Sequence, residues 1–157
     1  MLRFALVVLV AVGLSSCGGV YSTVCGGRAE MTNASLFCPN YHLTYRSAEC
    51  TIAEEIKQAE KTYRAPDPNR KYQTIHVSMN TDRYDDGVYE MIIFKGGEII
   101  AREKNRRPTI AGTAAGTWLA TMTILFPEPV ALPLDVVIIS LPSGDELVKY
   151  KIKPNEE

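Results

Sequence analysis

The sequence predicts a mainly β protein of α+β type: a small antiparallel sheet or β-sandwich with one N-terminal amphipathic helix. Three observations support this fold class. One segment near residue 50 has a helical hydrophobic period, the segments from residue 74 onward alternate with a period of two, and turn-forming residues separate them. We therefore expect one helix followed by five or six strands, joined mainly by hairpins.

The helix is expected over about residues 48–64. Its apolar side chains recur at helical spacing, at Ile52, Ile56, Ala59 and Tyr63, with Ala48 and Ala53 beside them. The charged residues expected to face away are Glu54, Glu55, Lys57, Glu60 and Lys61. Thr51 fits the first position of a capping box, and Ser47 offers a cap one turn earlier. Pro66 and Pro68 end the helix. We expect the apolar stripe to pack on the sheet.

Two hairpins follow an alternating strand. That first strand places Ile75, Val77 and Met79 on one face, with Thr74, His76 and Ser78 on the other. In the first hairpin, residues 88–94 become apolar on both faces, and Gly96 and Gly97 turn the chain into residues 98–104. In the second, a β-branched segment at 135–141 is joined by a turn at 142–145 to alternating residues 148–153.

The segment 110–126 admits two interpretations. Alternation of apolar residues from Trp118 to Phe126 predicts a half-buried strand. Small residues four apart, at Gly112, Gly116 and Ala120, and the absence of charge also fit a membrane helix. The segment is short, rich in threonine and closed by prolines, and the basic residues before it would lie on the exported side. We favour the strand, with 112–116 as a loop or turn.

Three regions are expected along the chain: a signal peptide at 1–16, a tether and irregular cysteine-containing segment at 17–46, and a single β-rich domain at 47–154. The second region is rich in Gly, Ser, Thr and Asn and has no hydrophobic period. Without residues 1–16 the chain keeps 16 basic and 18 acidic residues, a net charge near −2. Such a charge argues against a nucleic-acid partner, which requires a basic face.

Residues 1–16 have the pattern of a secretory signal peptide. Arg3 supplies an early positive charge, an apolar run follows it, and small residues come before Cys17. The run is shorter than the roughly 20 apolar residues that span a bilayer. We therefore expect this segment to be cleaved.

The four residues Leu14, Ser15, Ser16 and Cys17 resemble the lipobox of bacterial lipoproteins. The resemblance implies attachment of diacylglycerol to Cys17, cleavage before that residue and acylation of the new amino terminus. Two or three acyl chains make a durable anchor, because each buried CH₂ contributes about 0.8 kcal/mol. Gly18 in place of Asp would send the protein to the outer membrane of a Gram-negative host. The alternative is an ordinary secretory signal that carries a cysteine near its end.

Three cysteines remain after lipidation: Cys25, Cys38 and Cys50. Export would place them in an oxidising compartment, so we expect at least one intramolecular disulfide. We favour Cys38 with Cys50, because Cys25 lies among glycines near the expected anchor; a pairing that includes Cys25 stays open. Cys38, His42 and Cys50 also offer metal ligands, but their spacing matches no common zinc pattern.

The remaining candidate sites are weak. Four side chains before Gly87 could contribute oxygen ligands to calcium: Asn80, Asp82, Asp85 and Asp86. Their spacing is not that of an EF-hand loop, and tight turns prefer the same residues. We assign no metal site and expect no cofactor. His42 and His76 are the two histidines, and neither lies in a recognised nucleophile motif.

These observations favour a non-enzymatic lipoprotein of the cell envelope. Its membrane partner would be the bilayer that holds the acyl chains, and its β-rich domain would bind a protein or another envelope component, as an assembly or adaptor subunit. The main alternative is a calcium- or small-ligand-binding module. A hydrolase of envelope material is a third hypothesis. It requires His42 or His76 to lie beside a carboxylate and a nucleophile.

Overall fold

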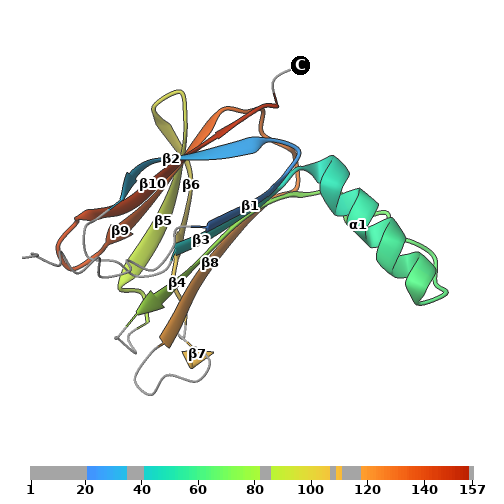
Figure 1. The fold of residues 1–157 in the computed structure, drawn as a ribbon, viewed down its shortest axis with the longest axis horizontal. Coiled ribbons are helices and arrows are strands. Elements are labelled where there is room, and N and C mark those ends of the chain that lie inside the picture. The colour runs from blue at the N-terminus through green and yellow to red at the C-terminus, as the bar shows by residue number, and fades with distance from the viewer. Residues whose placement is uncertain (1–20, 35–40, 82–85, 107–108, 111–117, 156–157) are drawn as a thin grey trace, which may run out of the picture.

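The computed structural model describes residues 21–34, 41–81, 86–106, 109–110 and 118–155. Two five-stranded sheets enclose one core, and a helix projects from one end (Figure 1). In order, the first sheet contains β1 (Tyr21–Cys25), β3 (Tyr41–Arg46), β4 (Gln73–Thr81), β8 (Trp118–Phe126) and β7 (Thr109–Ile110). The second contains β2 (Arg28–Ala34), β10 (Glu146–Lys153), β9 (Leu134–Ser140), β5 (Tyr89–Lys95) and β6 (Glu98–Lys104). The predicted mainly β fold with one helix is confirmed.

The hydrophobic core lies between the two sheets. Alternate side chains of six strands form one cluster: Tyr41, Leu43 and Tyr45; Ile75, Val77 and Met79; Ala120, Met122 and Ile124; Tyr89, Met91 and Ile93; Leu134, Val136 and Ile138; Val148, Tyr150 and Ile152. Their burial stabilises the fold by roughly 25 cal/mol for each Å² of apolar surface removed from water. The period of two seen in the sequence therefore reports which side chains face this core.

Both predicted hairpins are present and antiparallel. β5 pairs with β6, and the two glycines between them, Gly96 and Gly97, have positive φ values of 59° and 89°. β9 pairs with β10 through a turn in which Gly144 has a φ of 75°. Glycine adopts this backbone conformation without the steric cost that a Cβ brings. The turn chemistry therefore identified both hairpins correctly.

The strand interpretation of 110–126 is confirmed for β8, which pairs with β4 along its whole length. Residues 111–117 lie outside the described part of the chain. Within that part, no helix is both long enough and apolar enough to span a bilayer.

The expectation of irregular structure up to residue 46 is wrong. Three strands lie in this region, and β1 runs parallel to β3 while β2 runs antiparallel to β10. β3 carries the alternating buried residues Tyr41, Leu43 and Tyr45, interleaved with polar ones. β1 and β2 lie at the sheet edges, where pairing through the backbone does not require an apolar side-chain pattern. Their polar composition therefore concealed them.

The helix α1 spans Ala48–Lys61, in agreement with the prediction. Of the two caps considered, Ser47 is the one used: its hydroxyl accepts a hydrogen bond from the backbone N–H of Cys50 over 3.3 Å. Such a cap satisfies a donor that the first helical turn leaves without an intrahelical partner.

The predicted buried face of α1 is only partly correct: Ala48 and Ala59 are buried as expected, but other positions differ. Ile56 is 42% exposed and Tyr63, just beyond the helix, is 99% exposed, whereas Glu55 is only 3% exposed. The residues buried along the helix are Ala48, Thr51, Glu55 and Ala59. The helix projects past the end of the first sheet instead of lying across it, and the segment 62–72 returns beside it (Figure 1). This returning segment, rather than an apolar sheet, decides which side of α1 is covered.

Candidate binding cleft

A cleft of about 300 Å³ lies between α1 and the outer face of the first sheet. The helix contributes Thr51, Glu54, Glu55 and Gln58, the sheet contributes Thr44, Arg46, Thr74, His76, Thr123 and Leu125, and the segment before β4 contributes Arg70 and Tyr72. Its volume is at the lower end of the range for small-molecule sites, which hold a few well-placed polar groups. This recess unites polar side chains from separate parts of the described chain.

The wall formed by the sheet arises directly from strand alternation. Inward residues of β3, β4 and β8 fill the core, so the residues between them point outward. The register aligns Thr44 with His76 and His76 with Thr123 across the three strands. The Nδ1 atom of His76 lies 2.8 Å from the hydroxyl oxygen of Thr123. Burial, and secondarily the nearby His42, lower the pKa of His76 and favour its neutral form.

His42 lies on the same outer face, one register step from His76. Its Nε2 atom lies 2.9 Å from the hydroxyl oxygen of Thr23 on β1. Among the described residues, both histidines thus have threonine as their hydrogen-bond partner, and neither is hydrogen-bonded to a carboxylate. The two histidines therefore do not form the base–carboxylate pair that the hydrolase hypothesis requires.

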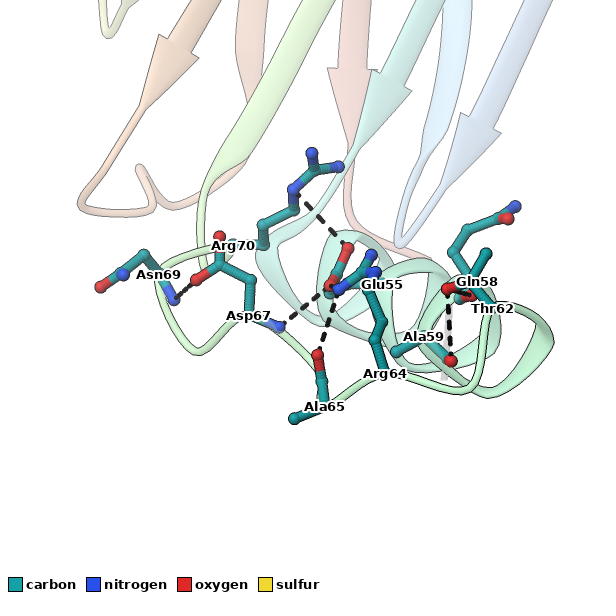
Figure 2. A network of polar contacts seen from close by, with 9 residues as sticks. All are labelled: Glu55, Gln58, Ala59, Thr62, Arg64, Ala65, Asp67, Asn69 and Arg70. Carbon is teal, nitrogen blue, oxygen red and sulfur yellow. Dashed lines mark hydrogen bonds and ion pairs between the residues drawn. The ribbon is translucent and has the colours of Figure 1, made fainter.

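The helical wall depends on the buried carboxylate of Glu55. Its Oε1 atom accepts hydrogen bonds from the backbone N–H of Asp67, over 2.9 Å, and from the Arg64 guanidinium (Figure 2). Its Oε2 atom lies 3.6 Å from Nε of Arg70. The hydrogen bond from Arg64 first, and then that from Asp67, lower the pKa of Glu55 to about 2. Glu55 therefore stays ionised and joins the helix to the returning segment.

Two guanidinium groups line the cleft, and they differ in their surroundings. Arg70 contacts Glu55 through Nε, and its terminal nitrogens point away from that carboxylate in Figure 2. Within the described part of the chain, the side chain of Arg46, at the end of β3, forms no hydrogen bond or close ion pair, but its charge contributes to the lowered pKa of Glu54. The nearby Glu54 receives a hydrogen bond from the Gln58 amide over 2.9 Å, which lowers the pKa of Glu54.

The first turn of α1 is held by a disulfide between Cys25 and Cys50. The expectation of an intramolecular disulfide is confirmed, but the favoured pairing of Cys38 with Cys50 is wrong. Cys25 is not in a loose tether: it ends β1 opposite Arg46, and the backbone N–H of Ser47 donates to the carbonyl of Cys25 over 3.0 Å. This strand pairing brings Cys25 beside the helix. Cys38 lies outside the described residues.

Several of the other residues singled out in the sequence fall outside the described part of the chain. Asp82 and Asp85 lie outside the described residues, as does Cys17. Asn80 belongs to β4, and Asp86 is exposed. In the described ranges no three His, Cys, Asp or Glu side chains are grouped as a metal ion would require. The calcium hypothesis, which includes Asp82 and Asp85, therefore stays a prediction.

Sequence reasoning missed the residues that build the cleft, above all Arg46, Glu55 and Arg70. A signal for Glu55 exists in retrospect, because it shares a helical face with Ala48, Thr51 and Ala59. Arg46 and Arg70 carry no local pattern, and only the pairing of β3 with β4 brings their segments together. Comparisons with protein-family models, with curated proteins and with solved structures found no match.

Proposed function

We propose that this protein is an exported lipoprotein, anchored to the envelope membrane through Cys17, whose sandwich binds another envelope component at the cleft beside α1. The role is one of binding and not of catalysis. The cleft combines donors, acceptors and two cations, and among the described residues the His76–Thr123 pair has no carboxylate hydrogen-bonded to the histidine. For a Gram-negative host, the outer membrane is the proposed location.

The disulfide between Cys25 and Cys50 supports export. Disulfides persist in oxidising compartments and are rare where thiols are kept reduced. The bond joins an edge strand to the helix beside the cleft. An oxidising compartment would thus stabilise the part of the molecule that we propose to be functional.

The observation that carries the proposal is the direction of β1. Cys17 precedes Tyr21 by four residues, and four extended residues reach no more than about 14 Å. β1 begins at Tyr21 and runs toward α1, ending at Cys25 beside the first turn of the helix (Figure 1). An anchor on Cys17 would therefore hold the beginning of β1 close to the bilayer, with α1 projecting away from it. A cleft beside α1 would then be accessible to a partner in the adjoining compartment.

Two experiments test the two parts of this proposal. Metabolic labelling with a fatty acid should mark the wild-type protein and not the Cys17→Ala variant; equal labelling of both would exclude the anchor. For the cleft, a photo-crosslinking amino acid replaces Gln58, which lines the cleft, or Glu60, which is an exposed helical residue outside its lining. We expect an envelope component to be captured from position 58 and not from position 60. Equal capture from both positions, or capture from neither, would contradict the proposed binding surface.

A further inference from the structure

The cleft beside α1 contains more cationic hydrogen-bonding capacity than the chain itself uses. Arg46 and Arg70 line it from β3 and from the segment before β4. A guanidinium presents five N–H donors in a planar fork that matches a carboxylate or phosphate group. Arg46 uses none of these donors within the described part of the chain, and Arg70 uses only its Nε edge, at 3.6 Å from Glu55.

The acidic residues of the cleft do not remove this capacity. Glu55 is held mainly by Arg64 and by the backbone N–H of Asp67, on the side of the helix that faces the returning segment (Figure 2). Glu54 accepts a hydrogen bond from Gln58. The carboxylate of Glu55 is therefore neutralised by Arg64, which lies outside the cleft lining. Arg46 and Arg70 then face one carboxylate, that of Glu54 near Arg46, and the cleft keeps a net positive charge for an anion.

The rest of the lining favours a hydroxylated ligand over a bare anion. Four threonines, Thr44, Thr51, Thr74 and Thr123, line the cleft beside the amide of Gln58. Hydroxyl groups both donate and accept hydrogen bonds, so they complement such a surface, and a ligand hydroxyl could also donate to Glu54. Tyr72 and the 53% exposed Leu125 supply an apolar wall against which the carbon face of a small ring can pack.

We propose that the cleft binds a small hydroxylated anion of the acidic-sugar type, with its carboxylate or phosphate group held by Arg46 and Arg70. This inference deepens the proposed function, because it rests on the cleft being the binding site, but it does not depend on the lipid anchor. The volume of about 300 Å³ suits one sugar-sized unit, either free or at the end of a larger envelope component.

Binding is tested by calorimetry and NMR titration of the full-length protein in detergent. The probes are glucuronate, glucose 6-phosphate, glucose and inorganic phosphate. We expect glucuronate or glucose 6-phosphate to bind and to shift the resonances of Thr44, His76 and Thr123, with both glucose and inorganic phosphate at least tenfold weaker. Comparison of the two acidic sugars distinguishes a carboxylate source from a phosphate source. Equal affinity for glucose would overturn the role of the cations, and equal affinity for inorganic phosphate would overturn the role of the hydroxyl groups.

Variants separate specific recognition from folding. Arg46→Gln should weaken binding of the acidic sugar at least tenfold without disturbing the Glu55 network, and Arg46→Lys should restore only part of the affinity because it keeps the charge but loses the fork. Lys57→Gln, on an exposed part of α1 outside the cleft lining, should change the affinity less than twofold. An unchanged affinity in Arg46→Gln, or no binding of either acidic sugar to the wild type, rejects the inference. If a partner is nevertheless captured from position 58, the cleft is still the binding site of the proposed function, and only the acidic-sugar ligand is rejected.

Discussion

The backbone N–H of Asp67 donates a hydrogen bond to Oε1 of Glu55, 12 residues earlier in the chain, over 2.9 Å. Arg64 binds the same oxygen, so one buried carboxylate joins the middle of α1 to the segment that leads into β4 (Figure 2). The helix projects beyond the sheet and has little other apolar support there (Figure 1). The position of α1, and therefore the width of the cleft, depends on this side chain together with the disulfide at the first turn of the helix.

Glu55→Gln should lower the thermal stability of the protein. The amide keeps the size of the side chain but loses the charge that binds Arg64 and Arg70, and hydrogen bonds to a charged group contribute more than those to a neutral one. We expect a fall in Tm of roughly 3–6 °C, measured by circular dichroism. Glu60→Gln, on an exposed part of the same helix, is the matched control and should change Tm by less than about 1 °C. A Glu55→Gln variant as stable as this control would contradict the role assigned to the network.

The same carboxylate predicts a pH dependence. The pKa of Glu55 is about 2 in the folded protein, against an ordinary value of 4.5. A depressed folded pKa gives stability that is fully present above about pH 4.5 and is lost as the pH falls from there toward 2. The difference in Tm between wild type and Glu55→Gln should therefore be constant from pH 7 to 5 and shrink between pH 4.5 and 2. A difference that stays constant down to pH 2 would contradict the ion pair.

Removal of the disulfide should destabilise the sandwich. Cys25 and Cys50 are separated by 25 positions, and cross-linking a loop of this length is worth about 3.5 kcal/mol through the entropy of the unfolded chain. Replacing both cysteines with serine should lower the free energy of unfolding by about that amount, measured by urea denaturation. Cys38→Ser tests the other pairing: we expect a smaller loss of stability than in the double variant. A larger loss in Cys38→Ser would show that the pairing is wrong.

Gly26 should not tolerate a side chain. Its φ is +82°, and a Cβ atom placed there would lie 2.4 Å from the hydroxyl oxygen of Ser47, the N-cap of α1. Gly144 has a similar φ of +75° but open space around the same position. Gly144→Ala should therefore lower the free energy of unfolding by about 1–2 kcal/mol, the cost of a positive φ for a residue with a Cβ. Gly26→Ala should lower it by at least about 1 kcal/mol more, because of the clash with Ser47. Equal losses in urea denaturation would show that the close approach to Ser47 has no energetic effect.

Replacement of Gln73 should destabilise the protein, because its side chain pairs with the backbone of Val130 as a neighbouring strand would. Its side-chain amide is buried, donates to the Val130 carbonyl over 3.0 Å and accepts from the Val130 N–H over 2.9 Å. Gln73→Leu would leave both backbone groups without these partners, at a cost of roughly 2–4 kcal/mol in the free energy of unfolding. Gln58→Leu, at a solvent-exposed position in the cleft lining, is the control and should stay within about 0.5 kcal/mol of wild type. A loss below 1 kcal/mol for Gln73→Leu would mean that water replaces the amide.

Local patterns in the sequence were sufficient to predict each helix or strand whose own residues carry a hydrophobic period or a turn signal. The alternation of Ile75, Val77 and Met79 identified β4, and the glycines at 96 and 97 identified the first hairpin. The helix was located for the same reason, since Ser47 marks its beginning and its end at Lys61 precedes the prolines at 66 and 68. Periodicity and turn chemistry depend on neighbours only a few residues apart, which a sequence displays directly.

The tertiary structure decided everything that depends on segments distant in the chain. The sequence by itself determined the class of fold, its hairpins, its helix and the expectation of a disulfide. Only the tertiary structure placed β1 beside β3, paired Cys25 with Cys50, buried Glu55 instead of Ile56 and brought Arg46 and Arg70 to one cleft. Edge strands and a projecting helix are stabilised by backbone pairing and ion pairs, which leave no hydrophobic period in the sequence.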